Sequence, residues 1–324
     1  MDYILKQIKT DLMPKPSKMG GYLYLDRIKV LAAFLVVFYH YSFYALDYGF
    51  KGTPYYPNAT RIIMSFAACS VPLFFMVNGA LMFLKKRNWF EVYYKAAKIV
   101  VLIMIFSTTG FPKWFFYTLT ILYLLFPMFY WLWDKHRNVY YGVIGIILLF
   151  PFMYNEGTIL LKLVWHLDYP ITGAKTMYSI AYFLLGNILF REKTFARWKS
   201  ILLIIGGMCL LLFDCVILTN YYQTISDGVN GAFPTIGALF LSVGTFELLK
   251  SIDHRDSSVL SFFSKGILAI YLLHMVVIKC LYTFLGKPTE LLIALIGSAL
   301  ICTVCCCIGW IVKKVPGLCF FMKI

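Results

Sequence analysis

The stretch Leu25-Asp-Arg-Ile-Lys29-Val-Leu-Ala-Ala-Phe-Leu-Val-Val-Phe-Tyr-His40-Tyr-Ser-Phe-Tyr-Ala-Leu46 is mostly apolar after its first turns, apart from one imidazole. It is long enough to cross a bilayer as a helix, which takes about 20 residues. Lys29 and His40 are eleven positions apart, which at about 100° per residue is three turns plus roughly 20°. Both side chains therefore project from one helix face, about 16 Å apart along its axis.

This spacing predicts a cation at the membrane surface and a titratable base near the bilayer centre. An ionisable side chain in a membrane-spanning helix is energetically costly, and such residues usually face the interior of a helix bundle or a water-filled pathway. The imidazole of His40 is also suited to proton transfer, because its unperturbed pKa of about 6.5 lies close to neutral pH. His40 is therefore the first candidate for a functional residue.

Composition places the whole chain in a membrane. Of its 324 residues, 61% are hydrophobic and 14% are charged, whereas a soluble domain carries about 25% charged residues. We expect an all-α, polytopic helical bundle, because open sheets and loops cannot span lipid. The apolar runs predict about ten spans, near residues 25–46, 62–84, 97–111, 114–133, 138–154, 174–190, 200–219, 232–249, 266–285 and 290–312.

The distribution of positive charge predicts the orientation, because basic residues gather on the cytoplasmic side. With ten spans and both termini inside, 23 of the 30 Lys and Arg residues are cytoplasmic. The other seven are Lys51, Arg61, Lys113, Lys162, Lys175, Lys279 and Lys287. We expect a cytoplasmic lead-in over residues 1–22, a transmembrane domain over 23–315 and a cytoplasmic tail over 316–324.

The net charge of +15 follows mainly from this inner-surface signal and from contact with anionic membrane lipids. It requires no nucleic acid partner. A smaller part of it could guide an anionic cytoplasmic ligand. The chain shows no glycine-rich nucleotide loop, no Ser-His-Asp order and no zinc-protease pattern, so any chemistry must come from ionisable groups within the spans.

Four of the nine cysteines lie together in the last expected span, at Cys302, Cys305, Cys306 and Cys307. Zinc sites usually draw paired Cys or His residues from separated segments, so we expect no metal site here. Small thiols also pack well between helices. We interpret this cluster as a packing surface.

Three further segments carry polar groups at membrane depth or at span ends. In the second span, Asn78 lies close to Pro72 and Gly79, and its amide needs a partner across a helix interface. Trp114, at the start of the fourth span, is typical of an interfacial anchor. Tyr271 and His274 share a face of the ninth span because they are three residues apart. This second imidazole is either a structural hydrogen-bonding group or a second functional group.

Five segments, in order, resemble the integral-membrane acyltransferase 3 family. They are Lys29 to His40, Val71 to Gly79, Trp114 to Pro127, Tyr182 to Gly186 and Ile270 to His274. The family's first span carries an arginine, ten intervening residues and a histidine. Lys29 and His40 occupy these positions, and Asp26 falls where an acidic residue is common.

The chain departs from the family pattern at two positions. Lys29 replaces the arginine, and the two residues are not interchangeable at a bidentate phosphate site. A lysine still neutralises a phosphate as a point charge, and Arg27 can supply a planar guanidinium. In addition, Pro112 stands where many members have a histidine. Donor use is the property that these departures would affect.

The resemblance implies a ten-span O-acyltransferase of cell-envelope glycans in a bacterial cytoplasmic membrane. The donor substrate would be acetyl-CoA or another acyl-CoA, with no bound cofactor. The acceptor would be a sugar hydroxyl of a polysaccharide or of its lipid-linked precursor. His40 would act as general base or carry the acyl group transiently. Arg27 and Lys29 would hold the donor, with supporting or cavity-lining roles for Asp26, Asn78, Trp114, Tyr271 and His274.

Two other classes of function are compatible with the residues. A bundle with buried His40 and His274 could export a glycan or act as a proton-coupled transporter, although no matching pair of broken-helix halves is evident. A catalytically silent scaffold is the third class. A homo-oligomer and a larger envelope-synthesis complex are both compatible with the sequence.

Overall fold

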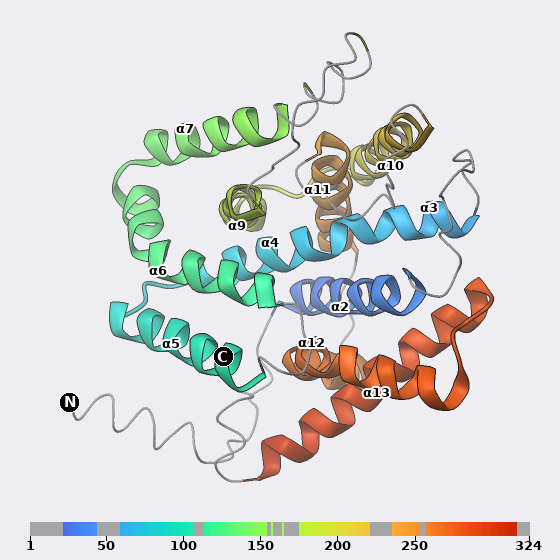
Figure 1. Ribbon diagram of the computed structural model, residues 1–324. Coiled ribbons are helices and arrows are strands. Elements are labelled where there is room, and N and C mark those ends of the chain that lie inside the picture. Colours follow the sequence, from blue (N-terminus) through green and yellow to red (C-terminus); the bar gives the residue numbers. More distant parts are fainter. Residues whose placement is uncertain are drawn as a thin grey trace. The chain divides into compact units, whose positions relative to one another are not determined.

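The computed structural model describes residues 22–43, 59–106, 113–153, 157, 164, 175–220, 235–252 and 257–315. Pro112, the lead-in up to residue 21 and the tail from residue 316 lie outside the described residues. Every regular element in the described ranges is a helix, as Figure 1 shows. This confirms the all-α prediction.

The helices follow the expected spans in order. They are α2 (Leu23–Phe43), α3 (Ala59–Phe66), η1 (Ala67–Cys69), α4 (Ser70–Phe83), α5 (Trp89–Ile105), α6 (Lys113–Lys135), α7 (Arg137–Ile147), η3 (Leu148–Met153), α9 (Lys175–Arg191), α10 (Arg197–Asn220), α11 (Ile236–Ser251), α12 (Ser258–Leu285) and α13 (Leu291–Lys314). The elements α3, η1 and α4 follow one another without a break, as do α7 and η3. Each expected span thus has a helical counterpart in the described residues.

Five helices of the described residues are long and apolar enough to cross a membrane. They are Ile62–Phe83, Lys113–Lys135, Arg197–Ile217, Ser258–Leu285 and Leu291–Lys314. The helix α2 has sufficient length but carries three charged residues, Asp26, Arg27 and Lys29, near its start. The chain is therefore a polytopic helical membrane protein.

Two helices begin eight residues before the apolar runs that predicted them. The helix α5 begins at Trp89 rather than at residue 97, and α12 begins at Ser258 rather than at residue 266. Polar and charged residues such as Glu91 end the apolar pattern without ending the helix. The start of α5 has a local cause, because the side chain of Asn88 accepts a hydrogen bond from the backbone N–H of Phe90 at 3.1 Å. An asparagine cap of this kind stabilises a helix start.

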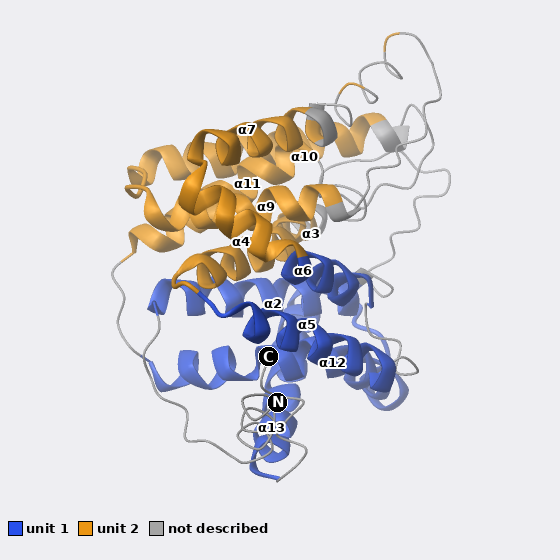
Figure 2. Ribbon diagram, turned by 90° about the vertical axis from the view of Figure 1, so that its left-hand side faces the viewer, with its two compact units in different colours: residues 1–42, 87–124, 254–324 blue, residues 43–86, 125–253 orange. Residues whose placement is uncertain are grey.

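The described helices belong to two compact units, which Figure 2 colours separately. Unit 1 comprises residues 1–42, 87–124 and 254–324 and contains α2, α5, the first half of α6, α12 and α13. Unit 2 comprises residues 43–86 and 125–253 and contains the remaining helices and the second half of α6. Each unit is assembled from segments that are distant in the sequence.

Within unit 2, α4 and α9 approach each other through glycines. A Cβ atom added to Gly79 would collide with the backbone carbonyl of Phe183, and one added to Gly186 would collide with the backbone of Met76. Only residues without a side chain permit backbones this close. Gly79 and Gly186 therefore permit the close packing of α4 against α9.

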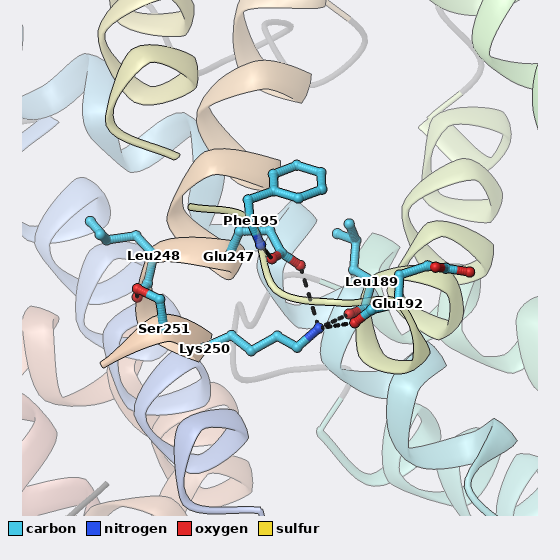
Figure 3. A network of polar contacts seen from close by, with 7 residues as sticks. All are labelled: Leu189, Glu192, Phe195, Glu247, Leu248, Lys250 and Ser251. Atoms are coloured by element: carbon cyan, nitrogen blue, oxygen red, sulfur yellow. Dashed lines mark hydrogen bonds and ion pairs between the residues drawn. The ribbon is translucent and has the colours of Figure 1, made fainter. Parts of the chain in front are cut away.

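Lys250 of α11 secures the connection between α9 and α10, as Figure 3 shows. Its ammonium donates to the carbonyls of Leu189 at 2.5 Å and Glu192 at 2.7 Å, at the carboxyl end of α9. Glu247 lies 3.7 Å from the same ammonium and accepts the backbone N–H of Phe195 at 2.8 Å. Because carbonyls at a helix end have no helical partner, a cation there satisfies them and interacts favourably with the helix dipole.

Within unit 1, α12 and α13 pack through small residues. A Cβ added to Gly266 would collide with the sulfur of Cys306, and one added to Gly309 would collide with the side chain of Ala269. Cys302, Cys305 and Cys306 are buried and Cys307 is exposed. The first three thus fill the interior as small apolar side chains, which agrees with the packing interpretation.

Replacing Gly79 with alanine should lower the thermal stability of the purified protein. The new methyl group must displace the backbone of α9, and overpacking of this kind costs about 1–3 kcal/mol. Gly206→Ala is the matched control, because nothing lies within 4 Å of an added Cβ there. Unfolding temperatures in detergent measure both effects. Equal temperatures for the two variants would contradict the close approach of α4 and α9.

Lys250→Met should destabilise the protein by on the order of 3 kcal/mol, because it leaves the buried Glu247 carboxylate without its cation. Adding Glu247→Gln should recover part of this loss, since the uncompensated charge is then removed. Lys193→Met, at an exposed position of the same α9–α10 connection, should have little effect. Thermal unfolding of the three variants checks the ion pair, and a Lys250 variant as stable as the Lys193 variant would count against it.

Candidate active site

The helix α2 carries Lys29 and His40, the two residues that the sequence predicts on one helix face. It runs without a break from Leu23 to Phe43, with His40 in its last turn. Lys29 and His40 therefore share one helix, as predicted, and regular helix geometry separates them by about 16 Å along the axis. The side chain of His40 is partly exposed in the described structure.

The ring of His40 faces a second imidazole from α12. The ring centroids of His40 and His274 are 5.3 Å apart, and the ring planes are tilted by 39°. His274 is fully buried. His40 thus faces a buried side chain of a neighbouring helix in the same unit, as expected for an ionisable residue in a lipid-embedded bundle.

His274 is held in place by its own helix. Its Nδ1 atom lies 2.9 Å from the carbonyl oxygens of both Ile270 and Tyr271. Both of these atoms can only accept, so Nδ1 carries the hydrogen and Nε2 is the acceptor nitrogen of the neutral ring. In the described residues, Nε2 is buried and has no hydrogen-bond partner.

A series of aromatic contacts extends from His274 to the start of α6. The ring of Tyr271 lies 5.9 Å from that of His274. It contacts Phe115 at 4.4 Å and Phe116 at 5.5 Å between centroids, both from the start of α6. Trp114 packs edge-on against Phe115 at 6.3 Å. Trp114 is thus linked to the histidines through Phe115 and Tyr271.

A second aromatic contact between α2 and α12 flanks His40. The rings of Tyr41 and Tyr282 stack at 5.4 Å, and the Tyr282 hydroxyl donates to the carbonyl oxygen of Tyr41. On α13, Gly297 leaves room for the Tyr41 ring, because a Cβ there would collide with it. These contacts fix the segment of α2 that presents His40.

At the other end of α2, Asp26 forms an ion pair with Lys29. The Asp26 Oδ1 and Lys29 Nζ atoms are 2.5 Å apart, with side-chain exposures of 23% and 24%. Arg27 lies between them in the sequence and is partly exposed. Three charged groups therefore gather at the helix start, about 16–21 Å from His40 along the axis.

Asn78 belongs to α4 in unit 2, whereas the residues described above belong to unit 1. The sequence predicts a partner for its amide across a helix interface. In the structure, Asn78 Nδ2 donates to the carbonyl of Phe74, one turn earlier in the same helix, at 2.9 Å. This bond satisfies part of the amide inside its own helix.

Sequence reasoning missed Phe115, Phe116, Tyr41 and Tyr282. Phe115 and Phe116 directly follow Trp114, in a run of aromatic residues that is typical of an interfacial belt. Tyr41 directly follows His40. Their contacts depend on which helices become neighbours, and no local pattern shows that.

In the described part of the chain, no group of three or more His, Cys, Asp or Glu residues could hold a metal ion.

Two facing imidazoles in an apolar bundle can transfer a proton. The ring of His274 offers an acceptor nitrogen, and His40 is partly exposed. The fold and this site define a polytopic membrane protein with an ionisable centre inside its helices. A family model described as an acyltransferase domain matches residues 22–112 and 109–310. The chain belongs to this acyltransferase 3 family and is a membrane acyltransferase.

No curated protein and no solved structure matches the chain. The family match covers α2 to α13 almost completely, since it ends within α13. It includes all the candidate residues on α2, α6 and α12.

Proposed function

We propose that this protein moves an acyl group, in the first instance acetyl, from cytoplasmic acyl-CoA to a sugar hydroxyl. The acceptor is a cell-surface polysaccharide or its lipid-linked precursor. The observation that carries this proposal is the placement of His40, on the same helix as Lys29 and facing the buried ring of His274. The family match supports group transfer over transport.

The proposed topology has ten spans with both termini in the cytoplasm. It is supported by the one-to-one order of helices and spans. Lys98 is one of the 23 basic residues that the topology assigns to the cytoplasmic side, and in the structure its side chain is buried within α5.

At the inner surface, Lys29 and Arg27 neutralise phosphate groups of the donor. A phosphate competes there with the carboxylate of Asp26 for the Lys29 ammonium. The extended pantetheine arm of acyl-CoA separates its phosphates from its thioester. Along α2, Lys29 and His40 are likewise separated, by about 16 Å. When the phosphates lie at the cationic end of α2, the arm brings the thioester carbonyl near the imidazole of His40.

In the transfer step, His40 removes the proton from the acceptor hydroxyl as its oxygen attacks the thioester carbonyl. A C–O bond forms, the C–S bond breaks, and the CoA thiolate leaves. The thiolate takes up the proton from the His40 imidazolium, which restores the neutral ring. A histidine positioned in this way contributes on the order of 10²–10⁴ to the rate as a general base.

His40→Ala should abolish transfer of labelled acetyl groups from acetyl-CoA by the purified protein, because the base is lost. Insertion and unfolding temperature should stay close to those of the wild type. Release of CoA thiol and incorporation of label into envelope glycans measure the reaction. Retained transfer in the alanine variant would remove His40 from the mechanism. Movement of an unmodified glycan would favour the transport alternative.

Lys29→Ala should raise the KM for acetyl-CoA and leave the choice of acceptor unchanged, because its proposed contact is with the donor phosphates. Lys29→Arg should retain donor use, since the guanidinium keeps the positive charge. Steady-state kinetics over a range of acetyl-CoA concentrations separate the two variants. An unchanged KM in the alanine variant would contradict the phosphate role.

A further inference from the structure

The Nε2 atom of His274 is an acceptor that lacks its donor. Nδ1 is committed as a donor to the carbonyls of Ile270 and Tyr271, both at 2.9 Å. Nε2 therefore keeps its lone pair, and this atom is buried without a hydrogen-bond partner in the described residues. A buried acceptor is destabilising unless a donor reaches it. The neighbouring ring of His40 is a candidate donor.

The separation of the two rings suits a hydrogen bond between them. An imidazole nitrogen lies about 1.2 Å from its ring centroid, and an N–H···N bond is about 2.9 Å long. Two rings joined in line by such a bond have centroids about 5.3 Å apart. The centroids of His40 and His274 are 5.3 Å apart, so the distance fits and a rotation of the His40 ring completes the alignment.

The surroundings make His274 the fixed member of the pair. Two backbone carbonyls hold its Nδ1, its side chain is fully buried, and Tyr271 lies beside it. His40 is partly exposed and stands in the last turn of α2. The fixed ring can therefore orient the more accessible one.

We propose that His274 is a positioning residue that accepts the ring N–H of His40 through its Nε2 atom. This inference rests on the proposed role of His40 as the base. The bond selects the His40 tautomer whose other nitrogen carries the lone pair, and it aims that nitrogen at the acceptor hydroxyl. When His40 takes the hydroxyl proton, the same N–H becomes part of an imidazolium, and its bond to Nε2 becomes charge-assisted and stronger.

The test is kinetic and uses the full-length protein with labelled acetyl-CoA. His274→Phe keeps a flat ring but has no acceptor nitrogen, whereas His274→Gln offers an amide oxygen in its place. The phenylalanine variant should lose kcat by on the order of 10–100-fold, the size of effect found when a residue that orients a metal-bound histidine is removed. Its KM for acetyl-CoA should not change. The glutamine variant should recover at least part of kcat.

A matched control is His136→Phe, at an exposed histidine between α6 and α7, which should keep wild-type kinetics. Wild-type kcat in folded His274→Phe would overturn the proposal. So would equal losses in the Phe and Gln variants at unchanged unfolding temperature, because an acceptor atom would then be irrelevant. If the phenylalanine variant does not fold, His274→Leu takes its place under the same criteria.

The His40→Ala variant separates this inference from the proposed function. Full transfer by His40→Ala would refute the role of His40 as base. An inactive His40→Ala together with wild-type kcat in His274→Phe would refute only the positioning role. Loss of kcat in both, with recovery in the glutamine variant, is the expected result.

Discussion

The structure depends on the need of polar groups within an apolar bundle to find partners inside the protein. Hydrocarbon offers no hydrogen bonds, so each buried donor or acceptor must be met by another part of the chain. The backbone carbonyls of Ile270 and Tyr271 meet one nitrogen of His274, and the carbonyl of Phe74 meets the amide of Asn78. At the end of α9, the ammonium of Lys250 has the same role. His274 Nε2 is among the buried side-chain atoms of the described residues that lack such a partner, and it lies on the residue that faces His40.

Close approach of helices at small residues helps to hold each unit together. Helices in lipid gain little from burying apolar surface, so they associate through small residues that let backbones meet. In unit 2 this occurs where Gly79 and Gly186 join α4 to α9. In unit 1, Gly266 and Gly309 do the same between α12 and α13. Gly266 and Gly309 hold α12 against α13, and α12 carries His274. This packing therefore supports the position of His274 opposite His40.

Much of the fold could be predicted from the sequence, because hydrophobic length determines which segments can cross a membrane. The apolar runs located α2, α6 and α13 to within a few residues. They placed the starts of α5 and α12 too late, since a helix continues through polar residues once it leaves hydrocarbon. The spacing of Lys29 and His40 followed from helix geometry alone. The contact of His40 with His274 could not be derived in this way, because 234 residues separate them and their proximity depends on how α2 packs against α12.

The ion pair at the start of α2 has a consequence for selectivity. Asp26 already occupies the ammonium of Lys29, so an incoming anion must exchange with a carboxylate instead of meeting a bare cation. A singly charged anion gains little by this exchange, because it replaces one negative charge with another. A group with two or more negative charges gains more from Coulomb attraction. If Lys29 binds a donor phosphate as proposed, its pairing with Asp26 would therefore favour a group with two or more negative charges over a singly charged anion.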